Sequence, residues 1–469
     1  MELLDDLVSR RLLVEHFSLG GELQLHFSHN KIKEFVTEEM SKSKKVLLHK
    51  RFAEYYEAQL KQTDDDSEHY PRIMYHHQES RNRTKYFEYR LKRFAGLVRI
   101  NHEMFPEINE KNDHTKTAIY LDKEEIEKEL NLIQEEYETI GEYESQEGFK
   151  EIQLVYLFTM GRLQVDVGNH QTGRQLIANT IQLAEELKNH DYQYKGWFKL
   201  VHMGINAFDL QEMAQALNAI EAQLARVHDE GALGKWLRLK GYYEILCGNH
   251  EAGTAHLQQS ISVFEKSLHR QRYLLSEAAA HLYLGESQRL QQQFSKAVVH
   301  YKEALKKCTD KKLYSGMAYT SASIGRVYYE MGDIREAQQY LTEAKGFYSN
   351  IIFMWGRYLP DAFLSLIHAQ LRDEQKALEY FKMAQGSIQR MANLYDQGVL
   401  CRVKAELLAL IKEFDNRRHF DEIIAENSEQ CCRNQQRCFD KPALAYEKKR
   451  MDILLQDPAV HQWFQHQES

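Results

Sequence analysis

The stretch GRVYYEMGDIREAQQYLTEA, residues 325–344, decides the fold of this chain. It places small, small, large and small side chains at four marker positions: Gly325, Ala337, Leu341 and Ala344. Residues 285–304, GESQRLQQQFSKAVVHYKEA, repeat this order forty positions earlier. Small residues let two helices approach closely, and a large residue fills the gap between them. The spacing therefore predicts a helical hairpin.

Six copies of this frame cover residues 151–390. Their first small residues are Gly161, Gly204, Gly241, Gly285, Gly325 and Ser365. Gly168-Asn169, Gly248-Asn249 and Gly332-Asp333 mark turns between paired helices, since glycine adopts the left-handed conformation cheaply and Asn or Asp can cap the next helix. One hairpin cannot bury its own apolar face, so the copies must stack. We expect an all-α fold, a right-handed superhelix of helical hairpins.

The composition supports an all-α protein and excludes several classes of function. Only 5 prolines and 23 glycines occur in 469 residues, which favours long helices. The net charge of −8 gives no general attraction to nucleic acid, so direct nucleic-acid binding is not expected. No apolar run approaches the roughly 18 residues of a membrane span, and the first residues lack a signal-peptide core. We therefore expect a cytoplasmic protein without a membrane partner.

The chain ends differ from the repeats. Residues 1–62 predict a helix over 3–16, a turn at 18–21, a strand over 22–27, and a helix capped by Ser28 or Asn30. Helical linker hairpins are expected over 63–150. Degenerate capping helices are expected over 391–469, because terminal repeats need a polar outer face.

Two resemblances to known families follow from these patterns. The frame is similar to the tetratricopeptide repeat, in the longer form of maltose-regulator-like sensors. The FSH motif at 27–29 and L-H-x-x-x-A at 48–53 resemble the end of the winged-helix domain of STAND-type signalling ATPases. This resemblance implies that residues 1–62 are a partial winged-helix segment, a small N-terminal winged-helix remnant. It also implies the sensor region of a bacterial signalling or transcription regulator.

The sequence contains no GxxxxGK[ST] phosphate-binding loop, and GALGK at 231–235 lacks its spacing. We therefore expect a chain without a nucleotide-binding domain. It would be a truncated gene product, an excised domain or a stand-alone descendant. A separate nucleotide-binding or DNA-binding subunit would be a possible partner.

The concave groove of the superhelix is the expected binding site, because the first helix of each hairpin faces it. Counting from the frame predicts six groove residues: Arg162, Arg238, Tyr242, Arg289, Arg326 and Tyr329. Arginine and tyrosine suit an extended peptide with an acidic group. The alternative to ligand binding is that these arginines only hydrate the groove or pair with its acids, since arginines are common on surfaces; this alternative stays open.

No chemistry beyond binding is expected. The six cysteines are irregularly spaced and predict neither a disulfide framework nor a zinc site. Adjacent His76 and His77 point in different directions on a helix, which disfavours a shared metal. No catalytic constellation is apparent, so we expect no enzyme, metal or cofactor.

The leading hypothesis is a protein- or peptide-binding repeat scaffold that acts as a sensor module. Two alternatives remain open. One is a constitutive assembly scaffold without ligand switching. The other is a phosphatase of the peptide-regulated repeat family, which acts on response regulators. That family also has repeats of about 40 residues, but its front is a helical bundle and this front is expected to carry a β-wing.

Overall fold

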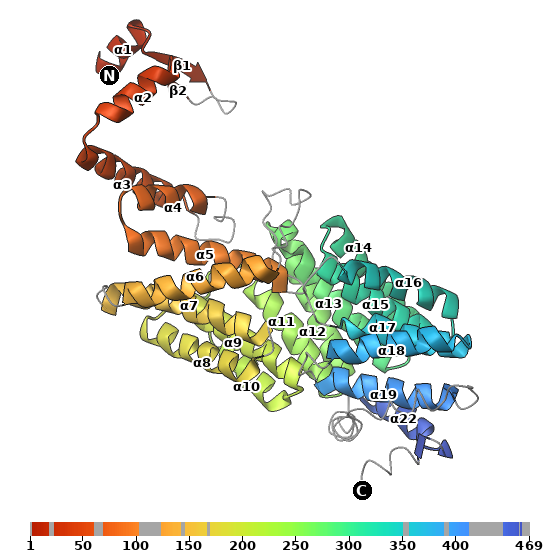
Figure 1. Cartoon of the computed structure of the whole chain (residues 1–469). Helices are drawn as coiled ribbons and strands as arrows, with labels where there is room; N and C mark the ends of the chain where they lie inside the picture. Colours follow the sequence, from red (N-terminus) through yellow and green to blue (C-terminus); the bar gives the residue numbers. More distant parts are fainter. Residues whose placement is uncertain are drawn as a thin grey trace. The chain divides into compact units, whose positions relative to one another are not determined.

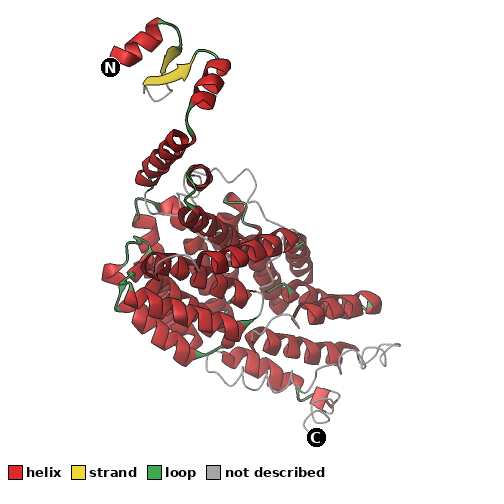
Figure 2. Ribbon diagram, turned by 60° about the vertical axis from the view of Figure 1, so that its left-hand side comes forward, coloured by secondary structure: helices red, strands yellow, loops and turns green. Residues whose placement is uncertain are grey.

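Helices dominate the computed structural model (Figure 1). It describes residues 2–17, 23–60, 69–102, 123–141, 146–166, 169–349, 356–388, 394–411, 444–458 and 460–461. Within these ranges the sheet content is a single antiparallel β-hairpin (Figure 2). The chain divides into two compact units, residues 1–93 with 136–140 and residues 94–135 with 141–469.

The first unit begins with the hairpin and short helices. Its elements are α1 (Glu2–Ser9), β1 (Leu13–Phe17), β2 (Leu23–Phe27), α2 (Asn30–Glu39), α3 (Lys42–Ala58) and α4 (Tyr70–Glu79), and α5 (Arg83–His102) begins in it. The predicted helix over 3–16 is wrong beyond Ser9. Residues 13–17 instead form β1 and pair antiparallel with β2, with Leu13 opposite Phe27 and Phe17 opposite Leu23. The predicted strand over 22–27 is present as β2, and β1 is its partner.

Local contacts correct two further expectations in this unit. His29 caps α2, and its Nδ1 accepts a hydrogen bond from the Lys31 backbone N–H at 3.2 Å. Ser28 and Asn30 do not occupy that position. The predicted turn at 18–21 lies outside the described residues.

The two adjacent histidines of α4 have different partners. His77 Nε2 lies 3.0 Å from Glu57 Oε1, and His76 Nδ1 lies 2.9 Å from His49 Nδ1. In the described ranges no group of three His, Cys, Asp or Glu side chains is placed to hold a metal ion.

The second unit contains six consecutive helical hairpins, which confirm the all-α, tetratricopeptide-like right-handed superhelix. They are α7 (Gln146–Asp166) with α8 (His170–Glu186), α9 (His190–Ala207) with α10 (Leu210–Glu221), α11 (Ala232–Leu246) with α12 (His250–Lys266), α13 (Arg270–Leu290) with α14 (Phe294–Asp310), α15 (Tyr314–Met331) with α16 (Ile334–Tyr348), and α17 (Tyr358–Gln370) with α18 (Glu374–Ile388). Helix α6 (Lys123–Gly141) precedes them, and α19 (Leu394–Leu410) and α22 (Ala445–Leu454) follow.

The marker glycines bring the paired helices into contact. A Cβ placed on Gly241 of α11 would lie 2.9 Å from the Gly253 carbonyl oxygen and 2.8 Å from Leu257 Cγ, both on α12. Gly204 departs from the frame: its Cβ would meet Met213 Cγ at 2.6 Å, because the chain turns earlier, at Phe208 with φ 56°. Small residues at these positions therefore set the distance between helices.

The predicted turns are confirmed where the structure describes them. Gly248 and Gly332 have φ values of 88° and 82°, in the left-handed region. Asp333 caps α16, and its Oδ1 accepts from the Glu336 N–H at 3.3 Å. Asn169 and Asn249 occupy the N-cap positions of α8 and α12, but their side chains make no capping hydrogen bond. Their amides instead donate to Gln164 Oε1 at 2.8 Å and to Glu244 Oε2 at 2.9 Å. Gly168 lies outside the described residues.

The first helices of the hairpins form one layer, which we call the inner layer. Within it α7 contacts α9, α11 contacts α13, and α15 contacts α17. Helix α19 contacts α17 and α18 of the last hairpin and also α9 of the second, so it lies across the inner layer. Helix α22 contacts α19 and α13.

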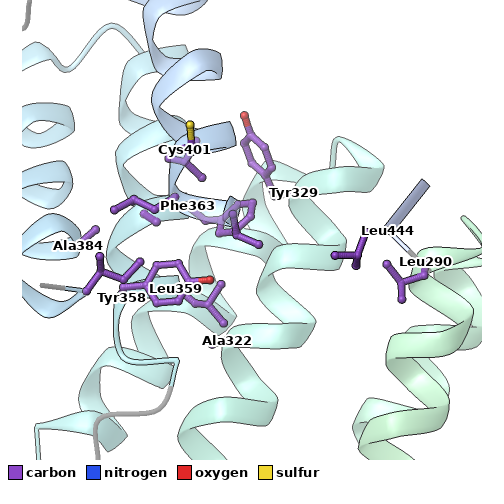
Figure 3. Packing of buried hydrophobic residues seen from close by; sticks show 14 of the residues in the cluster. Leu290, Ala322, Tyr329, Tyr358, Leu359, Phe363, Ala384, Cys401 and Leu444 are labelled. Atoms are coloured by element: carbon purple, nitrogen blue, oxygen red, sulfur yellow. The ribbon is translucent and has the colours of Figure 1, made fainter. Parts of the chain in front are cut away.

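Apolar side chains join the C-terminal helices to this layer (Figure 3). Cys401 of α19 belongs to the same buried cluster as Tyr329 and Phe363 of the inner layer. Leu444, next to α22, lies beside Leu290 at the end of α13. No helix in the described ranges is both long and apolar enough to cross a bilayer.

Candidate functional site

A buried group of charges, which we call the ion network, lies where α19 and α22 pack against the inner layer. It consists of Glu286 and Arg289 on α13, Arg326 and Glu330 on α15, Arg402 and Glu406 on α19, and Glu447 and Arg450 on α22. Four arginines and four glutamates balance each other. Each helix contributes one acid and one base three or four residues apart, so both lie on one helix face.

The Glu447 carboxylate is the centre of the network. Its Oε1 accepts from Arg289 Nη1 at 2.8 Å and from Arg326 Nη2, and its Oε2 lies 3.0 Å from Arg402 Nε. Arg289 and Glu447 both have exposed fractions of 0%. Three guanidinium groups from three helices therefore enclose one carboxylate, an arrangement that suits charge-assisted hydrogen bonds.

A second contact holds the next turn of α22. Arg450 Nη2 lies 3.2 Å from both oxygens of Glu406 on α19. Glu406 Oε1 also accepts from Tyr329 Oη at 2.7 Å. Glu447 and Arg450 are three residues apart, so one face of α22 places an acid against arginines and a base against a glutamate.

Tyr395 on α19 ties the network together. Its hydroxyl accepts from Arg289 Nη2 at 3.0 Å and from Arg326 Nη1 at 3.2 Å, and it donates to Glu286 Oε1 at 3.1 Å. Its ring stacks on Phe208, at the end of α9, with ring centroids 6.4 Å apart. The same residue thus connects α19 with three inner-layer helices.

The arginines keep the buried acids ionised. Burial would raise the pKa of Glu286, but Arg289 and Arg326 outweigh it and lower that pKa to about 2. Burial acts in the same way on Glu447, and the surrounding arginines hold its pKa far below the ordinary value.

Asp396 on α19 behaves in the opposite way. Burial raises its pKa to about 7, although the hydrogen bond from Tyr358 Oη at 3.0 Å and the charge of Arg326 favour ionisation. Desolvation therefore wins at this position, and the group titrates near neutral pH.

The earlier hairpins carry a different group, the basic cluster: Arg162 on α7, Lys199 and His202 on α9, and Arg238 on α11. Burial, followed by the charges of Arg238, Lys199 and Arg162, lowers the pKa of His202 to about 3. Three cations from three consecutive inner-layer helices thus act on one imidazole. The Arg162 guanidinium carbon lies 5.6 Å from the centre of the Phe158 ring.

The structure places the six predicted groove residues in three settings. Arg289, Arg326 and Tyr329 are buried in or against the ion network. Arg162 and Arg238 are also buried, at 8% and 5% exposure, in the basic cluster. Tyr242 is half-buried and stacks on Tyr283 of α13, with centroids 4.1 Å apart. Ligand binding by any of the six stays a prediction.

Sequence reasoning missed the acids that accompany these arginines, and the whole contribution of the C-terminal helices. The missed residues are Glu286, Glu330, Arg402, Glu406, Glu447, Arg450 and Tyr395. A signal for most of them was present, because acid–base pairs at three- or four-residue spacing recur on four helices. The repeat frame ends near residue 390, so it could not show that α19 and α22 meet the same arginines.

Comparisons with known proteins support the fold. No known family model matches the sequence, and no curated protein matches it. Among solved structures, a Rap protein complexed with Competence and Sporulation Factor is 13% identical, with a TM-score of 0.50 over 81% of this chain and 99% of that one. This likeness is in fold.

Two further structures are similar at lower scores. A STAND protein with a tetratricopeptide repeat sensor from Pyrococcus horikoshii is 14% identical, with a TM-score of 0.45 over 95% of this chain and 60% of that one. Aspartyl phosphate phosphatase F from Bacillus subtilis is 14% identical, with a TM-score of 0.40 over 72% of this chain and 90% of that one.

Proposed function

We propose that this chain is a scaffold that binds a peptide or protein segment along its inner layer, as the sensor module of a bacterial signalling or transcription regulator. The observation that carries the proposal is the position of α19, a helix of the same chain that contacts both α9 and α17. A surface that holds one helix through arginine, glutamate and tyrosine side chains has the chemistry to hold another.

The basic cluster points to the chemistry of the ligand. Arg162, Lys199 and Arg238 come from three neighbouring helices and act together on His202. Arg162 and Arg238 are more than 90% buried and Lys199 is half-buried, so Lys199 is the cation of this cluster that a ligand reaches most directly. A lysine at the edge of a basic cluster favours a carboxylate, either an acidic side chain or a peptide C-terminus. We therefore assign an acidic peptide segment to the inner layer of α7, α9 and α11.

Fluorescence anisotropy with two labelled peptide libraries tests this assignment. The libraries have the same length and differ only in carrying Glu or Gln at fixed positions. We expect the Glu library to bind at least tenfold more tightly than the Gln library. The affinity of the Glu library should also fall as the salt concentration is raised. Equal binding of both libraries would exclude the acidic ligand.

Two variants locate the binding. Lys199→Gln removes a cation of the basic cluster and is expected to weaken Glu-library binding about tenfold, the loss of one charge-assisted contact. Lys195→Gln is the matched control, because Lys195 is on the same helix but exposed and lies over the Tyr192 ring at 4.8 Å. The same loss in both variants would place the ligand elsewhere.

The alternatives make different predictions. A constitutive scaffold would keep the same X-ray scattering profile at all concentrations of a binding peptide. A response-regulator phosphatase would accelerate the loss of phosphate from a phosphorylated response regulator, whereas a sensor scaffold leaves that rate unchanged.

A further inference from the structure

The short helix α22 is held mainly by contacts with other parts of the chain. It has ten residues, Ala445–Leu454, and follows residues 412–443 in the sequence. An isolated helix of fewer than about 12 residues is marginal in water. Its helical form in this structure therefore depends on the surface against which it docks.

That surface recognises two charges one helical turn apart. Arg289, Arg326 and Arg402 enclose the Glu447 carboxylate, and Glu406 receives Arg450. Both charges of α22 meet opposite charges, and the site without α22 still contains three arginines and three glutamates. A replacement ligand must therefore offer an acid and a base, because either charge alone would leave a buried partner uncompensated.

Apolar contacts fix the orientation of α22. Met451, one residue after Arg450, is fully buried. The Tyr446 ring makes an edge contact with Phe294 of α14, with centroids 6.0 Å apart. The opposite face is open, since Asp452 is exposed and Ile453 is 57% exposed. The helix thus docks through one face, as an amphipathic ligand in a groove does.

We propose that α22 is a detachable internal ligand, and that its site on α13, α15 and α19 also binds an amphipathic helix of a partner protein with the pattern Glu-x-x-Arg-apolar. This deepens the proposed function, since it rests on the inner layer being a binding surface and names a partner for its C-terminal part. The covalent connection gives α22 a high effective concentration at the site, so the partner helix competes with it.

The full chain can be tested with a peptide that copies α22. The probe is fluorescein-labelled LAYEKKRMDILLQDPAVH, residues 444–461. In the Glu447→Lys protein a lysine faces three guanidinium groups, so α22 is displaced and the site becomes available. Asp452→Lys adds the same charge change on the exposed face of α22 and is the matched control.

We expect the Glu447→Lys protein to bind the peptide at least tenfold more tightly than the wild-type and Asp452→Lys proteins. A second peptide with Gln in place of the glutamate should bind that protein at least tenfold more weakly. Equal binding by the three proteins, or of the two peptides, would overturn the proposal. If Glu447→Lys loses its helical circular dichroism, Glu447→Gln replaces it under the same criteria.

Two further outcomes separate this inference from related ideas. If light scattering shows that Glu447→Lys forms a dimer that the added peptide does not dissociate, a second copy occupies the site and the partner helix is excluded. If the peptide of residues 444–461 fails to bind while the Glu library still depends on Lys199, this inference falls and the proposed function stands.

Discussion

Replacing Gly241 by alanine tests whether close helix contact at the marker positions stabilises the superhelix. The added Cβ would lie 2.9 Å from the Gly253 carbonyl oxygen and 3.1 Å from the Leu257 backbone nitrogen, both on the facing helix α12. These are backbone atoms, so the helices must separate to admit the methyl group. Overpacking of this kind costs about 1–3 kcal/mol.

The substitution also has a stabilising effect, the higher helix propensity of alanine, and a control variant can cancel it. Alanine is about 1 kcal/mol better than glycine inside a helix. Apart from the backbone of its own helix, nothing lies within 4 Å of the Cβ position of Gly346 on α16. Gly346→Ala therefore gains the helix propensity of alanine without a clash. The difference in unfolding free energy between the two variants should therefore be about 1–3 kcal/mol, with Gly241→Ala the less stable.

Urea unfolding followed by circular dichroism at 222 nm measures this difference. Equal denaturant slopes are required for the comparison, because a changed slope would indicate a change in the unfolding unit. If Gly241→Ala were as stable as Gly346→Ala, the close approach of α11 and α12 would not be a constraint, and the physical reading of the repeat frame would be refuted.

Three further predictions concern the C-terminal part. As the pH rises from 4 to 7, Asp396→Asn should become more stable than the wild type by up to about 4 kcal/mol. The reason is that the aspartate releases its proton near pH 3.8 in the unfolded chain and near pH 7 in the folded one. Parallel pH profiles of the unfolding free energy in urea would contradict this. Tyr329→Phe should cost about 1.5–3 kcal/mol in the same assay, since it removes the hydroxyl donor to Glu406, and a loss below about 0.5 would refute that role. Arg289→Met should cost about 3–5 kcal/mol, because it leaves buried carboxylates without this partner, and thermal unfolding near the wild-type midpoint would contradict it.

The repeat part of the fold could be predicted because its signal is local and recurs. Gly325 and Leu341 are sixteen residues apart in sequence, and the same pair of small and large residues returns in other copies. The turn glycines could be predicted for a similar reason, since a positive φ is cheap only for glycine. Asn249 shows the limit: a side chain that can cap a helix also has other partners.

The hairpin near the N-terminus was only half predicted. Residues 13–17, LVEHF, read apolar, apolar, polar, polar, apolar, which continues the amphipathic pattern of α1 and lacks the alternation of a strand. The pairing with β2 overrides this local pattern. Whether residues 13–17 form a strand therefore depends on residues 23–27, which lie outside that short stretch of sequence.

The candidate site could be predicted in part. Counting along the frame found arginines that the structure places in the inner layer, including Arg289 and Arg326. It could not find Glu447, which is 121 residues beyond Arg326 and lies outside the repeats. Contacts over such separations leave no periodic trace in a single sequence, so burial of the arginines was not foreseen.

The central claim is that the inner layer holds the chain's own C-terminal helix through paired charges. A double-mutant cycle with Arg326→Met and Glu447→Gln tests this directly, with unfolding free energies measured for the wild type, both single variants and the double variant. We predict a coupling free energy of about 1–3 kcal/mol between these residues. A coupling within about 0.3 kcal/mol of zero would show that α22 does not depend on the arginines and would contradict the account.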